Sequence, residues 1–149
     1  MQLNPDFRAF IELLNANRVR YLVVGGYAVA HHGHPRYTKD LDIWLEVSEA
    51  NAASVSKTLA DFGMGQIGLG PKDFLEPDAV IQLGYPPRRI DLITSLDGVT
   101  FEDCYARRTE VKWDGLSISM VDLQDLIKNK RAAGRYQDLA DIENLDREV

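Results

Sequence analysis

Two aspartates separated by a single residue, Asp40 and Asp42, have the types and spacing that most directly predict chemistry in this chain. They open an expected strand over residues 40–47, and side chains two apart on a strand point to the same face. Two like charges about 4 Å apart repel by roughly 4 kcal/mol at an effective dielectric near 20. A bound cation would relieve this repulsion, and carboxylate oxygens are the ligands that suit Mg²⁺.

A glycine pair precedes these aspartates. The apolar run Tyr-Leu-Val-Val at residues 21–24 is typical of a strand buried on both faces, and Gly25-Gly26 follows it directly. Glycine lets the backbone approach a ligand closely, and the N–H groups at the start of the next expected helix attract phosphate. The sequence therefore predicts a phosphate site and a metal site at neighbouring strand ends.

A third acidic residue, Asp91, lies in an expected strand over residues 88–95. Strand alternation places Arg89, Asp91 and Ile93 on one face. A single acid in an apolar strand is usually paired with a nearby cation, and Arg89 is the obvious partner. The residues alone therefore favour an ion pair at this position.

The other elements follow from apolar periodicity, helix caps and turn residues. Asp114-Gly115 between two alternating runs predicts a hairpin, and the last helix is expected to turn Leu139, Ile142 and Leu145 inward. Together the patterns predict an α/β (α+β) fold: one domain over residues 1–149, with a mixed sheet of about four to six strands. The expected helices cover residues 4–17, 26–32, 49–62, 101–107, 122–133 and 136–145, and the expected strands cover residues 20–24, 40–47, 79–83, 88–95, 110–113 and 116–120.

Composition limits the possible classes of function. The 149 residues carry a net charge of −6, which argues against a broad non-specific grip on nucleic acid. The lone Cys104 excludes an intramolecular disulfide. No apolar run approaches the roughly 18 residues of a membrane span, and the N-terminus lacks a signal-peptide pattern. We expect a cytoplasmic protein with no membrane association.

The histidine cluster His31, His32 and His34 invites a metal interpretation. A structural zinc site needs four ligands, and the single cysteine is remote in the sequence. We therefore interpret these histidines as the end of a helix, where a histidine interacts with the last carbonyls.

The stretch GGYAVAHHGHPRYTKDLDIW resembles the signature of the polymerase β-like nucleotidyltransferase superfamily. In that superfamily a Gly-Gly or Gly-Ser turn is followed at short distance by Asp-x-Asp or Asp-x-Glu. The spacing Arg36-x-Thr38-x-Asp40-x-Asp42 is similar to a small bacterial branch that includes abortive-infection toxins. Gly26 stands where many members have serine, so one hydroxyl contact to phosphate is missing from the pattern.

A second segment, LIKNKRAAGRYQDLADIENL, resembles the same branch, with Lys130, Arg135, Asp138 and Asp141 at the matching positions. Taken alone, these residues predict a salt-bridged, solvated helix pair. The resemblance covers about residues 20–145 and implies a nucleotidyltransferase-like fold that ends in a helix pair. It also implies that Asp91 is the third carboxylate of the superfamily, which competes with its interpretation as a simple ion-pair partner.

The function implied by this resemblance is a magnesium-dependent nucleotidyltransferase, which moves a nucleoside monophosphate from a nucleoside triphosphate to a hydroxyl acceptor. The acceptor stays open between transfer RNA, a protein and a small molecule. A role as a toxin–antitoxin component, with an antitoxin partner, is also implied. The implied catalytic and metal-binding residues are Asp40, Asp42 and Asp91, with two Mg²⁺ ions, and the implied nucleotide-binding residues are Gly25, Gly26, Arg36, Thr38 and Lys130.

Two alternatives from other classes remain. One is a catalytically silent member of the fold that serves as a binding module or partner subunit, and the other is a phosphate-binding protein without chemistry. If the acceptor is RNA, the locally basic residues 104–135 are the expected contact surface.

Overall fold

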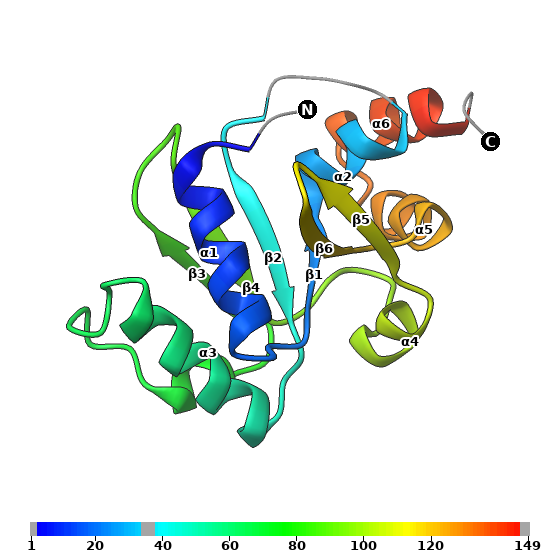
Figure 1. Ribbon diagram of the computed structural model, residues 1–149. Coiled ribbons are helices and arrows are strands. Elements are labelled where there is room, and N and C mark those ends of the chain that lie inside the picture. The colour runs from blue at the N-terminus through cyan, green and yellow to red at the C-terminus, as the bar shows by residue number, and fades with distance from the viewer. Residues whose placement is uncertain (1–2, 34–37, 147–149) are drawn as a thin grey trace.

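The computed structural model describes residues 3–33 and 38–146. In this part of the chain a six-stranded mixed sheet has the order β3-β4-β2-β1-β6-β5 (Figure 1). Its strands are β1 (Tyr21–Val24), β2 (Leu41–Leu45), β3 (Val80–Leu83), β4 (Ile90–Ile93), β5 (Thr109–Trp113) and β6 (Leu116–Met120). The helices are α1 (Pro5–Ala16), α2 (Gly25–His32), α3 (Glu49–Asp61), the short 3₁₀ helix η1 (Pro71–Phe74), α4 (Phe101–Ala106), α5 (Leu123–Ala133) and α6 (Tyr136–Asp146).

The strand pairing brings distant parts of the sequence together. β1 runs antiparallel to β2, β2 runs parallel to β4, and β1 runs parallel to β6. The edge strands β3 and β5 pair antiparallel with β4 and β6. The end of β1 and the starts of β2 and β4 therefore meet at one end of the sheet, where the Gly-Gly turn leaves β1.

The two faces of β2 pack against different elements. Leu41, Ile43 and Leu45 alternate with Asp42 and Trp44, and all three apolar residues are buried. Trp44 is also buried and packs edge-on against Phe101 of α4, so α4 covers the face that carries Asp42. Trp44 is therefore part of the core.

The helices form two groups around this sheet. In Figure 1, α1 crosses in front of the sheet near β2 and β4, with α3 beside its lower part. α5 and α6 pack on each other at the opposite side, and α2 packs against both. The site-bearing end of β1 and β2 therefore has the C-terminal helix pair as a neighbour.

The predicted fold class is confirmed, including the C-terminal helices and the hairpin. Asp114 and Gly115 both have positive φ, at 50° and 82°, as a two-residue hairpin turn of this type requires. Three helices begin at side chains that cap them, Asn4, Ser48 and Asp122, each of which accepts a backbone hydrogen bond. Among the described helices, none is long and apolar enough to cross a membrane.

Two local expectations were wrong. β2 ends at Leu45, so Val47 lies beyond the strand and is 42% exposed. Leu139 on α6 is 50% exposed, whereas Ile142 and Leu145 are buried as expected. The inward face of α6 is instead shared with the fully buried carboxylates Asp138 and Asp141, and this rotates Leu139 toward solvent.

Candidate active site

The carboxylates predicted from the sequence come together at the starts of β2 and β4. Asp42 lies directly opposite Asp91 in the parallel register, and Asp40 precedes β2 by one residue. Directly paired residues on neighbouring strands present their side chains to the same face. Asp91 is 8% exposed, so much of this acidic surface is removed from water.

Arg89 links two of these carboxylates. Its Nη2 donates hydrogen bonds to Asp40 Oδ2 at 2.8 Å and to Asp91 Oδ2 at 3.1 Å. Its Nε lies 2.9 Å from Asp91 Oδ1, close enough for an ion pair although not aligned as a hydrogen bond. The ion pair expected for Asp91 is therefore present, and sequence reasoning missed that it extends to Asp40.

Asp42 is the carboxylate without such compensation. It forms no ion pair with any residue in ranges 3–33 and 38–146. Burial raises the pKa of Asp42 to about 7, and repulsion from Asp91 and Asp40 adds to the shift, while Lys130 and Arg89 oppose it. An additional cation at this position would restore the ionised form at neutral pH.

The glycine turn touches this same carboxylate. Gly25 has φ +67°, and a Cβ placed on it would overlap the Oδ2 atom of Asp42. α2 begins at Gly25, and its N-cap, Val24, provides no side-chain hydrogen bond. The first N–H groups of α2 therefore lie beside Asp42 without a side-chain cap, while Gly26 is buried as the second residue of the helix.

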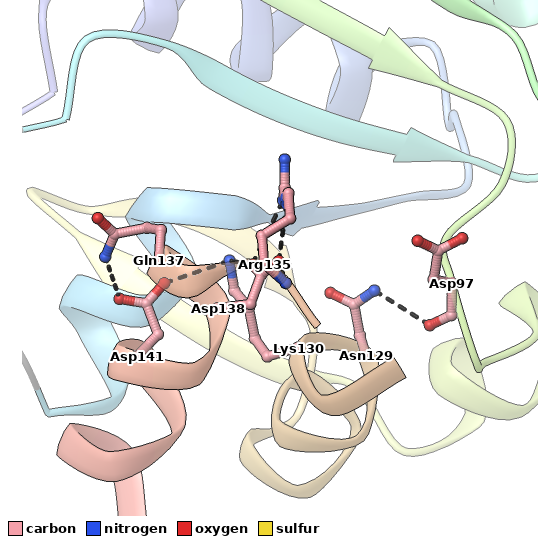
Figure 2. A network of polar contacts seen from close by, with 7 residues as sticks. All are labelled: Asp97, Asn129, Lys130, Arg135, Gln137, Asp138 and Asp141. Carbon is pink, nitrogen blue, oxygen red and sulfur yellow. Dashed lines mark hydrogen bonds and ion pairs between the residues drawn. The ribbon is translucent and has the colours of Figure 1, made fainter. Parts of the chain in front are cut away.

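The remaining predicted nucleotide contacts are less directly placed. Arg36 lies outside the described residues, as does His34. Thr38 is partly buried and lies two residues before Asp40. Lys130 is 6% exposed, and its Nζ lies in an ion-paired network between α5 and α6 (Figure 2), so it does not present an open ammonium group.

Ready-made metal clusters are absent from the described residues, where no three His, Cys, Asp or Glu side chains are grouped to hold an ion. At the carboxylates, the guanidinium of Arg89 contacts both Asp40 and Asp91. At the end of α2, His32 Nε2 lies 2.8 Å from the carbonyl oxygen of Val121. His32 thus lies at a helix end as expected, but the carbonyl that it contacts follows β6 and does not belong to the last turn of α2.

The geometry has the arrangement that the resemblance to nucleotidyltransferases implies. A Gly-Gly turn leads from a buried strand into a helix, and it lies beside an Asp-x-Asp strand with a third aspartate in register. The chain belongs to the family described as nucleotidyltransferase of unknown function (DUF6036), whose sequence profile matches residues 6–146. The expected superfamily resemblance is thus confirmed, and with it the class of enzyme.

Solved structures share the fold. A candidate nucleotidyltransferase of Thermotoga maritima, TM1012, has a TM-score of 0.65 at 14% identity, covering 99% of this chain and 97% of that one. The lincosamide antibiotic adenylyltransferase LnuA, solved with lincomycin, has a TM-score of 0.57 at 13% identity, with 99% and 98% covered. An antigenic nucleotidyltransferase-like protein of Paracoccidioides brasiliensis has a TM-score of 0.54 at 15% identity, covering 93% of this chain and 72% of that one. A search of curated proteins gave no match.

Proposed function

We propose that this protein transfers a nucleoside monophosphate from a nucleoside triphosphate to a hydroxyl acceptor, with Mg²⁺ as cofactor and pyrophosphate as leaving group. The observation that carries the proposal is the meeting of Asp40, Asp42 and Asp91 beside the Gly25 turn. Membership of a nucleotidyltransferase family supports the reaction class.

The donor set fits a hard divalent cation. Asp42 has a pKa of about 7 because its charge is buried and is repelled by Asp91 and Asp40. Asp40 Oδ1 is buried and accepts no hydrogen bond from the part of the chain that the structure describes. We propose that Asp40 and Asp42 hold two Mg²⁺ ions and that Asp91 shares one of them. When bound, such ions neutralise charge on the phosphoryl group and on the attacking and leaving oxygens.

Different residues of the protein would then bind the nucleotide and accept the proton. Asp91 is proposed to help accept the proton of the attacking hydroxyl. The N–H groups of Gly25 and Gly26 at the start of α2 would bind phosphate, because the positive end of the helix dipole lies there. Arg36 and Thr38, which precede the aspartates at alternate positions, are proposed to contact the nucleotide.

Arg89 would hold Asp40 and Asp91 together and offset their mutual repulsion before the ligand binds. Its guanidinium already neutralises part of the charge of Asp40 and Asp91. Full use of both carboxylates by a metal would require Arg89 to give up at least one of these contacts. Binding therefore exchanges one cation for another, and the loss of an Arg89 contact offsets part of the electrostatic gain from the metal.

The acceptor is proposed to be one of three classes: an RNA end, a protein hydroxyl or a small molecule. One observation weakens the RNA option, because much of the basic stretch 104–135 is neutralised internally. Arg107 pairs with Asp125, Arg108 with Glu110, and Lys130 with Asp138. A small-molecule acceptor is in keeping with LnuA, whose name describes an adenylyltransferase of lincosamide antibiotics and whose chain matches this one almost end to end.

The biological setting suggested by the abortive-infection resemblance is a cytoplasmic toxin–antitoxin pair. In that setting a second protein, the antitoxin, would be the partner of this chain. A catalytically silent binding module is the competing proposal. The two differ in whether the protein releases pyrophosphate.

The test is to incubate purified protein with each of the four labelled triphosphates, Mg²⁺ and separate preparations of total RNA, total protein and small molecules. Pyrophosphate release together with label in one fraction identifies the acceptor class, and Asp42→Asn and Asp91→Asn should abolish both. Failure of every triphosphate to release pyrophosphate with any fraction would support the silent module. Normal turnover in either variant would contradict the proposed metal site.

A further inference from the structure

The lysine predicted to contact the nucleotide is enclosed by acids. Lys130 Nζ lies 3.1 Å from Asp138 Oδ1 and 3.4 Å from Asp141 Oδ2, and all three side chains are at most 8% exposed (Figure 2). Asp141 also accepts a hydrogen bond from Gln137 at 2.8 Å. Moving Lys130 onto a phosphate would leave two buried carboxylates with much less compensation, at a large cost. Lys130 is therefore placed to hold Asp138 rather than to contact a ligand.

Arg135 has the opposite character. Its side chain is 77% exposed, although one edge of the guanidinium is fixed to Asp138. Nε donates to Asp138 Oδ2 at 2.7 Å, Nη2 donates to Asp138 Oδ1 at 3.3 Å, and the backbone N–H donates to Oδ2 at 3.2 Å. Within residues 3–33 and 38–146 no hydrogen-bond partner of Nη1 is found. The free edge of a pre-oriented guanidinium thus faces solvent.

The corner that carries Arg135 is tied to the sheet. Gly134 ends α5 in the left-handed conformation, with φ 68°, and turns the chain into α6. Asn129 Nδ2 donates to the carbonyl oxygen of Asp97 at 3.1 Å, in the loop that follows β4. In the same loop Gly98 packs so closely on Ala132 that a Cβ would clash with it. Arg135 therefore lies in the connection between α5 and α6, and this connection is fixed to the loop that follows β4, the strand that bears Asp91.

Arg135 also lies within electrostatic reach of the carboxylate site. The pKa of Arg135 is raised mainly by its hydrogen bond to Asp138, and the charges of Asp97 and Asp42 add to the shift. α2, whose first residue touches Asp42, packs against both α5 and α6. The exposed cation and the acidic cluster therefore belong to the same part of the molecule.

We propose that Arg135 binds the β- and γ-phosphates of the triphosphate, with Asp138 and Lys130 as positioning residues that hold its guanidinium in place. This inference rests on the proposed function, because bond cleavage at the carboxylates places the α-phosphate there and directs the pyrophosphate portion toward a neighbouring cation. A planar guanidinium with one edge free matches two phosphate oxygens, whereas the buried ammonium of Lys130 does not. The site would select triphosphates over monophosphates through this contact.

The probes are inorganic tripolyphosphate, ATP and AMP, and the measurement is the dissociation constant by titration calorimetry at low salt. The variants are Arg135→Ala, Arg135→Lys and, as matched control, Arg131→Ala, which removes another exposed arginine of the same region. Arg135→Ala should weaken tripolyphosphate and ATP tenfold or more and leave AMP within twofold. The affinities of Arg135→Lys should lie between those of the native protein and Arg135→Ala, because lysine keeps the positive charge but loses the planar pair of N–H donors. Arg131→Ala should resemble the native protein for all three probes.

The outcomes separate this inference from the transfer reaction. Weaker tripolyphosphate binding in Arg135→Ala supports the inference even if no acceptor is labelled. Equal tripolyphosphate affinity in the native protein and in Arg135→Ala overturns the inference and leaves the transfer proposal standing. The inference is also overturned, and the transfer proposal kept, if the native protein binds no tripolyphosphate but releases pyrophosphate from a triphosphate. If Arg135→Ala does not fold, Arg135→Lys decides the question: unchanged tripolyphosphate affinity in that variant also overturns the inference.

Discussion

Gly25 and Asp42 are in direct contact: the carboxylate oxygen Oδ2 occupies the space where any other residue at position 25 would place its Cβ. The same glycine has a positive φ of 67°. Two independent constraints therefore act at one position, one on the backbone and one on the space above it. The turn proposed to bind phosphate and the strand proposed to bind metal are in contact at this point.

Gly25→Ala should destabilise the fold and abolish nucleotide binding. Gly68→Ala is the matched control, because Gly68 has a similar φ of +84° and nothing within 4 Å of a Cβ. The control should cost about 1 kcal/mol for backbone strain alone. Urea unfolding gives the loss in the free energy of unfolding for each variant. The extra loss in Gly25→Ala measures the clash with Asp42. Equal losses in the two variants would show that the contact has no energetic weight.

Asp42→Asn should stabilise the protein, and more so at high pH. The pKa of Asp42 is about 7 in the folded protein and near its ordinary value of 3.8 in the unfolded chain. The folded state therefore binds more protons between about pH 4 and 7, and the free energy of unfolding falls as the pH rises through that window. The three-unit shift corresponds to at most about 4 kcal/mol.

This pH effect is measured by urea unfolding at pH 5, 6, 7 and 8 without Mg²⁺. Asp103→Asn is the control, since Asp103 is an exposed acid on α4. Native protein and the control should lose stability with rising pH, whereas Asp42→Asn should lose less. A decrease that is equally steep in all three would mean that Asp42 ionises normally.

Mg²⁺ together with a triphosphate should raise the melting temperature, and each alone should raise it less. Binding to the native state at about 100 times Kd adds roughly 2.7 kcal/mol. Because metal and proton compete for Asp42, the apparent affinity for Mg²⁺ should increase with pH up to about 7 and then level off. Asp40→Asn should remove the shift. An unchanged melt with all four triphosphates at millimolar concentration would favour a silent module.

Arg89→Met should impair the site without unfolding the protein. It removes the cation that contacts both Asp40 and Asp91, so repulsion among the carboxylates should increase. Stability should fall at pH 8, Mg²⁺ should restore part of it, and transfer should decline at least tenfold. Arg88→Met is the control, because its ion pair with Asp6 spans 3.4 Å at the surface. Similar behaviour of the two variants would deny Arg89 any special role.

Lys130→Met should strongly destabilise the C-terminal helix pair. It leaves Asp138 with Arg135 and removes the ammonium group from Asp141, and breaking a buried pair typically costs about 3–5 kcal/mol. The free energy of unfolding from urea titration is the measurement, and Lys128→Met on the exposed face of α5 is the control. A loss of nucleotide affinity with unchanged stability would instead favour direct contact between Lys130 and the ligand.

Local signals in the sequence were sufficient for most elements of the fold. A helix cap such as Ser48, the Asp114-Gly115 turn and the alternation around Asp42 each depend on residues a few positions apart. Such patterns act through backbone geometry and short hydrogen bonds, so they are visible without tertiary information. The aspartates and the glycine turn were identified for the same reason.

Only the tertiary structure decided how these residues meet. The register that sets Asp91 opposite Asp42 joins strands separated by three other elements and their loops, and it follows from the packing of the whole sheet. The reach of Arg89 to Asp40 depends on that register. Burial of Lys130 depends on how α6 packs on α5, since the identical residue on an isolated helix would be solvated. Sequence determined which groups are available, and long-range packing determined which of them are charged, paired or exposed, because desolvation and distance are properties of the assembled core.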